Sequence, residues 1–163
     1  MRDPQSRFLL SPQRGTYAVI LACSRTALAR IGKLGRMELR PGFYAYVGSA
    51  LGPGGVRARL HHHLRIAARP HWHIDYLRAF CDVVEVWVSC DPGRQEHVWA
   101  KAIGGLPTAD VPMPGFGASD CKCAAHLFWL PRRPSIQVFR RQVQRRVSRL
   151  VAPKVPPANC GRS

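Results

Sequence analysis

The chain has 163 residues, 46% of them hydrophobic, and its 25 lysines and arginines against 9 acidic residues give a formal net charge of +16. This length suits one folded domain with a single core, and the hydrophobic content excludes an intrinsically disordered chain. The positive charge favours a polyanionic partner, with nucleic acid as the first candidate and an anionic membrane surface as its main rival.

The ends of the chain differ from its middle in composition. The N-terminal stretch MRDPQSRFLLSPQ lacks the features of a secretory signal, and no apolar run is long enough to span a membrane. We therefore expect a soluble, cytoplasmic protein whose six cysteines are reduced thiols. No acidic residue occurs from Pro131 onwards. This predicts an N-terminal extension over 1–13, a folded domain over 14–130 and a basic extension over 131–163.

Hydrophobic periodicity and turn residues predict the elements in chain order. Strands are expected over 16–23, 28–34, 42–48, 82–90 and 123–130. Helices are expected over 55–68 and 71–81, and a third begins with Asp91 as its N-cap and Pro92 at its first position. The order predicts an α/β (α+β) fold in which helices pack against one small mixed sheet.

The helix predicted over 55–68 has an apolar and a charged face. Its buried stripe consists of Val56, Leu60, Leu64 and Ala67. The side chains expected in solvent are His61, His62, Arg65 and Arg69. Arg59 and His63 border the stripe, where a helix can present polar groups beside a packed core.

A final helix is predicted over 135–151. Its apolar residues, on one face, are Ile136, Phe139, Val143, Val147 and Leu150. Its arginines, on the opposite face, are Arg140, Arg141, Arg145, Arg146 and Arg149. This helix can dock on the domain and present arginines to phosphates, or lie on an anionic membrane or a protein partner.

Two tripeptides carry a resemblance to a known family. Gly15-Thr16-Tyr17 heads the first strand, and Tyr46-Val47-Gly48 ends a later one. In this order, followed by Arg59, His63 and Glu96, they resemble the paired motifs of the GIY-YIG nuclease superfamily. The stretches HWHIDYL and GFGASDCKC are similar to a poorly characterised prokaryotic branch that is sometimes joined to an endonuclease III-type protein. The long interval between Tyr17 and Tyr46 predicts an extra strand or hairpin inserted between the two motifs.

The resemblance implies a metal-dependent endonuclease whose catalytic residues are Tyr17, Tyr46, Arg59, His63 and Glu96. Arginine suits phosphate oxygens because its charge is permanent and its donors are fixed in a fork. Glu96 supplies a hard oxygen ligand for Mg²⁺ or Mn²⁺. The family favours Tyr17 as the general base, whereas intrinsic pKa values favour His63, and both remain candidates.

Further residues are candidates for contacts with substrate. Those expected to bind substrate or phosphate are Gly48, Ser49, Arg57, Arg65, His71 and His73. Trp72 and Tyr76 would pack or stack on bases. The alternative is structural, since tyrosines in strands are commonly packing residues and a histidine beside an apolar stripe is commonly a core residue.

Cys121, Cys123 and His126 form a weak candidate metal cluster. Structural zinc sites normally combine two ligand pairs, and the sequence shows no second pair, so zinc is not expected. The leading hypothesis is therefore a Mg²⁺- or Mn²⁺-dependent endonuclease acting on DNA in repair or processing, with RNA as a further substrate class. The rivals are a non-catalytic nucleic-acid-binding module and a membrane- or partner-docking protein that uses the last helix.

Overall fold

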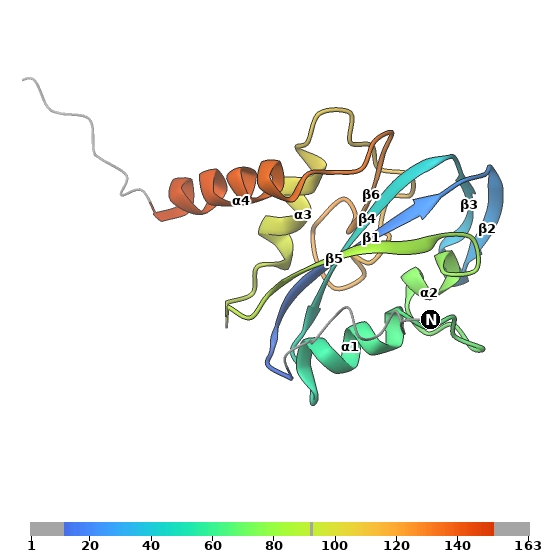
Figure 1. The fold of residues 1–163 in the computed structure, drawn as a ribbon, viewed down its shortest axis with the longest axis horizontal. Helices are drawn as coiled ribbons and strands as arrows, with labels where there is room; N and C mark the ends of the chain where they lie inside the picture. The colour runs from blue at the N-terminus through green and yellow to red at the C-terminus, as the bar shows by residue number, and fades with distance from the viewer. Residues whose placement is uncertain (1–11, 92, 152–163) are drawn as a thin grey trace, which may run out of the picture.

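The fold is built on a four-stranded antiparallel sheet with the strand order β5-β1-β4-β6 (Figure 1). The computed structural model describes residues 12–91 and 93–151. The strands are β1 (Gly15–Cys23), β4 (Gly42–Ala50), β5 (Asp82–Ser89) and β6 (Leu127–Leu130). The central pair β1 and β4 carries both tripeptides, and their register sets Tyr17 opposite Gly48. The predicted α+β class is confirmed.

A separate hairpin fills the interval between the two tripeptides, as predicted. It consists of β2 (Ala27–Ile31) and β3 (Gly35–Leu39), joined by the 3-10 turn η2 (Gly32–Leu34). The prediction of one strand over 28–34 is wrong, because Gly32 has a φ of 47° and turns the chain there. β3 was not predicted, although its buried Met37 and Leu39 alternate with exposed residues.

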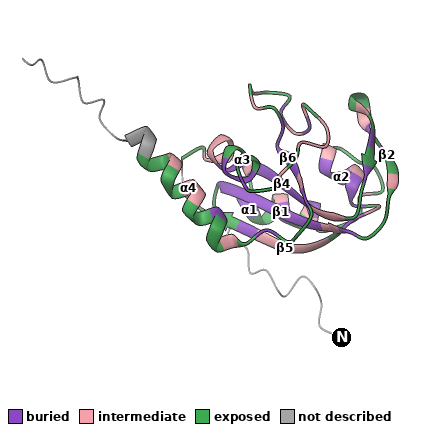
Figure 2. Ribbon diagram, turned by 90° about the horizontal axis from the view of Figure 1, so that it is seen from above, coloured by how far each residue is buried: buried purple, intermediate pink, exposed green. Residues whose placement is uncertain are grey.

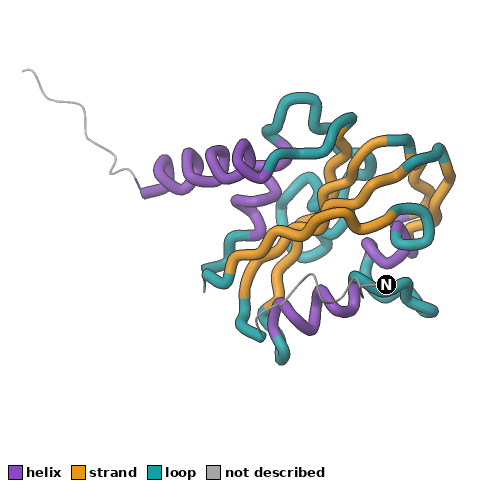
Figure 3. Tube along the Cα trace, in the orientation of Figure 1, coloured by secondary structure: helices purple, strands orange, loops and turns teal. Residues whose placement is uncertain are grey.

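Both faces of the sheet are covered, so β1 is a nearly continuous apolar run (Figure 2). One face packs under α1 (Gly55–His63), α2 (His73–Leu77) and the hairpin, with Tyr17 and Tyr46 in that core. The opposite face packs against α3 (Glu96–Gly104) and α4 (Ile136–Val151), as the tube view also makes clear (Figure 3).

The first two helices are shorter than predicted. α1 ends at His63 instead of 68, because the buried guanidinium of Arg78 donates hydrogen bonds to the carbonyl oxygens of His63, at 3.0 Å, and Leu64, at 3.3 Å. The helix predicted over 71–81 contains only the short α2. The helix gives way to a turn after Leu77, whose carbonyl oxygen accepts hydrogen bonds from the amides of Phe80 and Cys81, both at 2.9 Å. The Arg78 side chain also donates to the carbonyl oxygen of Cys81.

The start of α3 also differs from the prediction. Asp91 is not its N-cap, because the Asp91 carboxylate accepts hydrogen bonds from the Gly93 amide and the Gln95 side chain in a preceding turn. The helix starts at Glu96 with Gln95 as N-cap. Pro92 lies outside the described residues. The last strand is shorter too: 121–126 form a loop, and β6 begins at Leu127.

The predicted C-terminal helix is confirmed as α4, apart from its first residue. Phe139 is buried between Trp87, at 4.7 Å between ring centroids, and Trp99, at 4.9 Å. This anchors the apolar face of the helix on β5 and α3. The side chains of residues 149–151 lie outside the described part, so Arg149 and Leu150 stay untested. No helix within 12–91 or 93–151 is long and apolar enough to cross a bilayer.

Candidate active site

The two tripeptides meet at the paired ends of β1 and β4. Tyr17 is 1% exposed, and its hydroxyl lies directly over Gly48 on the neighbouring strand. A methyl group at residue 48 would collide with the Tyr17 hydroxyl and ring. Glycine in the second tripeptide is therefore explained by the space that the first tripeptide's phenol occupies.

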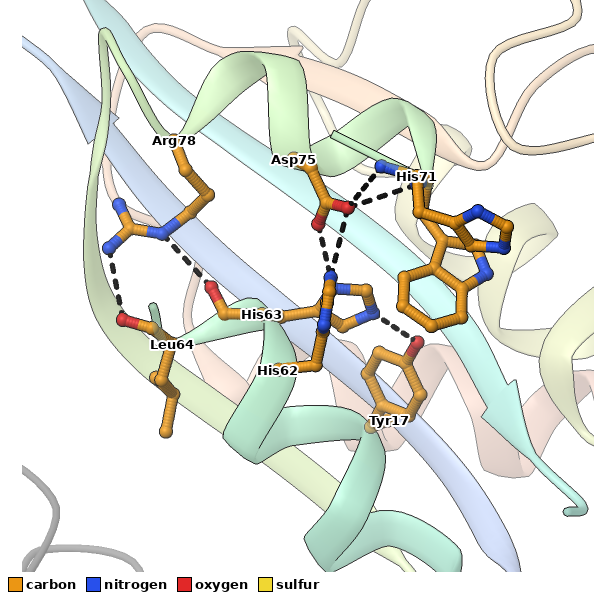
Figure 4. Close-up of polar contacts among 8 residues, drawn as sticks. Tyr17, His62, His63, Leu64, His71, Asp75 and Arg78 are labelled. Carbon is orange, nitrogen blue, oxygen red and sulfur yellow. Dashed lines mark hydrogen bonds and ion pairs between the residues drawn. The ribbon is translucent and has the colours of Figure 1, made fainter. Parts of the chain in front are cut away.

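The Tyr17 hydroxyl is hydrogen-bonded to Nε2 of His63 at 2.9 Å (Figure 4). His63 is the last residue of α1, and it is fully buried against β1. Its other ring nitrogen, Nδ1, faces Oδ1 of Asp75 at 3.4 Å. The phenol, the imidazole and the carboxylate thus form a buried chain that links β1, α1 and α2.

Asp75 is fixed in this chain by several donors. Its Oδ2 accepts hydrogen bonds from the backbone amides of His71, at 2.9 Å, and Trp72, at 3.0 Å, and from Nε2 of His62, at 2.9 Å. Burial alone would raise the pKa of Asp75. The hydrogen bonds from His63, His62 and the two amides outweigh it and hold the pKa well below its usual value.

An ionised Asp75 determines the protonation of His63. A carboxylate accepts hydrogen bonds only, so the proton of neutral His63 belongs on Nδ1, facing Asp75. Nε2 then carries a lone pair and accepts the hydrogen bond from the Tyr17 hydroxyl. Burial lowers the pKa of His63, which favours this neutral form near pH 7. The arrangement resembles a triad in which a carboxylate orients an imidazole toward a hydroxyl.

Tyr46 presents the second phenol. It is 7% exposed, no described residue forms a hydrogen bond with its hydroxyl, and the hydroxyl is not among the buried unpaired atoms. The hydroxyl therefore reaches solvent, whereas the ring packs against His63, at 6.0 Å between ring centroids, and Phe116, at 6.1 Å. Burial raises its pKa to about 12, so Tyr46 is a neutral donor near pH 7.

Arg59 and Glu96 place opposite charges near these phenols. The guanidinium of Arg59 lies over the Trp72 ring, 4.3 Å from its centroid, beside a hollow of about 230 Å³. Burial raises the pKa of Tyr17 well above its usual value; the charge of Arg59 opposes this rise, and that of Glu96 adds to it. Ring contacts bring Tyr17, Tyr46 and His63 together. Arg59 lies beside Trp72, and Glu96 is the first residue of α3.

The predicted substrate-binding residues lie in different parts of the structure. Ser49 is half-buried on β4, whereas Arg57 and Arg65 are exposed, and Arg65 is hydrogen-bonded to His61 at 2.7 Å. His71 and His73 line a second hollow with Arg30, Gly32, Lys33 and Tyr76. Nδ1 of His73 accepts a hydrogen bond from the Gly117 amide at 3.0 Å, so His73 holds the loop before β6.

Sequence reasoning placed two residues wrongly or gave them too little weight. His62 was expected in solvent, but it is half-buried because its ring reaches Asp75 and packs on Trp72, 4.5 Å between ring centroids. Asp75 was not among the predicted site residues, and its contact with His63 was missed. A signal existed: an acidic residue in the first turn of a short helix commonly binds the preceding amides.

Cys121, Cys123 and His126 lie together, and His97 of α3 joins them. Cys121 and Cys123 are half-buried in the loop before β6, and His126 is buried.

The chain was compared with known proteins and structures. A family model described as Domain of unknown function DUF123 matches residues 16–149. No curated protein and no solved structure matches the chain.

Proposed function

The chain belongs to the family described as Domain of unknown function DUF123, and we propose that it is a metal-dependent endonuclease that hydrolyses phosphodiester bonds in DNA. The observation that carries the proposal is the buried chain in which Oδ1 of Asp75 faces Nδ1 of His63 at 3.4 Å and Nε2 of His63 is hydrogen-bonded to the Tyr17 hydroxyl. Phosphodiester hydrolysis requires a proton acceptor next to fixed positive charge, and Arg59 supplies that charge. The order of the sequence motifs supports the same assignment.

The proton acceptor is Tyr17 and His63 acting together. The Tyr17 oxygen takes a proton from the attacking water while the Tyr17 hydroxyl proton passes to Nε2 of His63. Burial disfavours a free phenolate at Tyr17, so the two transfers are coupled. Asp75 stabilises the imidazolium that results. Tyr46 and Arg59 bind phosphate oxygens, the first as a neutral donor and the second as a cation.

A Mg²⁺ or Mn²⁺ ion, when bound, would activate a water and offset charge on the phosphate. Glu96 is the residue that would hold it, since its side chain is 17% exposed and its charge acts on both phenols. A single carboxylate suits Mg²⁺, which usually keeps several of its waters.

The experiment is a nicking assay on supercoiled plasmid DNA with Mg²⁺ or Mn²⁺. We expect wild-type protein to nick the plasmid. Arg59→Ala and Glu96→Ala should each lower activity by about 100-fold or more, the usual effect of removing a group that stabilises the transition state. Matched controls are Arg36→Ala and Glu38→Ala, exposed residues of the β2-β3 hairpin. Circular dichroism checks that all four variants fold. Unchanged nicking by both site variants would trace the activity to a contaminant or to another site.

The burial of Tyr17 and His63 favours a second candidate function. Tyr17 is 1% exposed and His63 is 0% exposed, as befits a structural pair, while α4 presents exposed arginines. A module that binds nucleic acid without cleaving it would combine these features. Salt-dependent DNA binding, with no cleavage of plasmid, branched or single-stranded substrates in any metal, would select it over the nuclease.

A further inference from the structure

We propose that His97, Cys121, Cys123 and His126 bind one zinc ion. One ligand atom from each residue can be chosen so that all four lie within 4.8 Å of one another. Nδ1 of His97 is 3.2 Å from Sγ of Cys123, and Nε2 of His126 is 3.4 Å from Sγ of Cys121. In a tetrahedral zinc site with bonds of about 2.0–2.3 Å, ligand atoms are separated by about 3.6 Å. The cluster thus needs only a small adjustment around an ion.

The fold brings a fourth ligand, His97, to the three that are close together in the sequence. The short C-x-C-x-x-H segment lies in the loop before β6, and His97 comes from the first turn of α3, which packs on the neighbouring face of the sheet. The His97 and His126 rings are in edge-on contact at 5.9 Å. Two cysteines and two histidines are a common set for structural zinc, and thiolates favour zinc over Mg²⁺.

Neighbouring groups hold these ligands in place. The backbone of His126 is fixed on both sides, since its amide donates to the carbonyl oxygen of Phe116 at 2.7 Å and its carbonyl accepts from the Val47 amide at 2.9 Å. The Cys123 amide faces Sγ of Cys121 at 3.5 Å, where it would stabilise a thiolate. Nε2 of His97 is 3.6 Å from Oε1 of Glu96, and a carboxylate in that position orients a metal-binding histidine.

Four protein ligands leave no open position, so the zinc is structural rather than catalytic. It would tie the loop that contacts Tyr46, through Gly117, to the start of α3, where Glu96 lies. The ion would thereby fix the position of Glu96 relative to the phenols. This role is independent of nuclease activity, because zinc binding is measured without substrate.

The first experiment measures zinc in the purified full chain, kept reduced, by elemental analysis and by titration of chelator-treated protein. We expect about one zinc per chain. His97→Ala and Cys123→Ser should each weaken binding by more than about 100-fold, since removing even a hydrogen-bond partner of a ligand costs about 10–100-fold. Cys90→Ser and His61→Ala are the matched controls. Cys90 is an exposed free cysteine, and His61 is an exposed histidine of α1 outside both groups that could hold a metal ion.

Cobalt gives a second readout, from the wild-type protein and from a variant that keeps four ligands. Co²⁺ in the wild-type site should give the visible absorption of tetrahedral coordination and thiolate-to-cobalt charge transfer. His97→Cys keeps four ligands and adds a thiolate, so it should still bind Co²⁺, with stronger charge transfer. Absence of zinc and cobalt binding in folded wild-type protein, or binding unaffected by both His97→Ala and Cys123→Ser, would overturn the proposal.

Discussion

The close contact between Gly48 and Tyr17 explains why residue 48 is a glycine. The Tyr17 hydroxyl occupies the space in which a side chain at residue 48 would begin, so this position is closed to larger residues although its backbone is an ordinary strand. The same contact holds the hydroxyl in line with Nε2 of His63. Packing at Gly48 therefore controls the geometry of the Tyr17–His63 hydrogen bond.

Gly48→Ala should destabilise the protein by about 1–3 kcal/mol, the usual effect of overpacking a closed core. It should also break the Tyr17–His63 hydrogen bond, because the phenol must move. Denaturant unfolding measures the first effect, and the NMR shifts of the His63 ring nitrogens report the second. Gly52→Ala is the control, since nothing lies within 4 Å of a side chain there. Equal stability of the two variants would show that the strands adjust freely.

Asp75 couples stability to pH. Its pKa is lower in the folded protein than the usual value near 3.9, so the stability it contributes is present above that value and is lost as pH falls below it. The charge also holds together groups from two places in the chain, namely His62 and His63 at the end of α1 and the amides before α2.

Asp75→Asn should therefore destabilise the fold by about 3 kcal/mol near pH 7, because it removes the charge from a buried hydrogen-bonded group. The difference from wild type should shrink as pH falls from about 5 toward 2. Urea unfolding across this range measures it. Asp120→Asn, an exposed residue of the loop before β6, should follow wild type at every pH. A difference that does not depend on pH would mean that Asp75 acts through its shape alone.

Strands and helices were predicted well where the hydrophobic pattern of the sequence is regular. The first strand, the Tyr46 strand and the helix at the C-terminus each have a clear period, and each is found close to its predicted bounds. Helix ends were predicted poorly. The end of α1 is set by a distant group, the guanidinium of Arg78, which takes its last carbonyl groups, whereas a local turn at Asp91 delays the start of α3.

The candidate site could likewise be predicted only in part. The order of the motifs along the chain was sufficient to predict that Tyr17, Tyr46 and His63 lie together. The contact of Asp75 with His63 and that of His97 with Cys123 depend on which loops and helices pack together, which no local pattern encodes. A fourth zinc ligand on a helix far from the cysteines has no fixed spacing that a sequence could reveal.

The apolar face of α4 already packs against the domain. Phe139 stacks on Trp87 and meets Trp99 edge-on, so the apolar stripe that could have entered a membrane packs largely against the domain. Val147 remains 39% exposed near the end of the helix. The face that stays available to a partner is the arginine-rich one, which favours phosphates over lipid chains.

The net positive charge of the molecule is large, and the positions of the cations determine which of them can contact DNA. A net charge of +16 draws the protein to any polyanion, whereas a specific contact surface needs particular cations at the DNA backbone. Arg140 and Arg145 are exposed on α4, and Arg25 and Arg36 are exposed at the β2-β3 hairpin, on the other side of the sheet. Substituting either pair removes the same formal charge, so the two pairs separate local contact from general attraction.

We expect duplex DNA binding by wild-type protein to weaken steeply with salt. Changing Arg140 and Arg145 to Gln should reduce the slope of log K against log salt by about 0.9 for each phosphate that is no longer neutralised, because each neutralised phosphate releases condensed counterions. Changing Arg25 and Arg36 to Gln should leave the slope close to wild type. Fluorescence anisotropy over a salt series gives both slopes. Equal reductions would mean that only total charge matters, and an unchanged slope in the first variant would remove α4 from the DNA-binding surface.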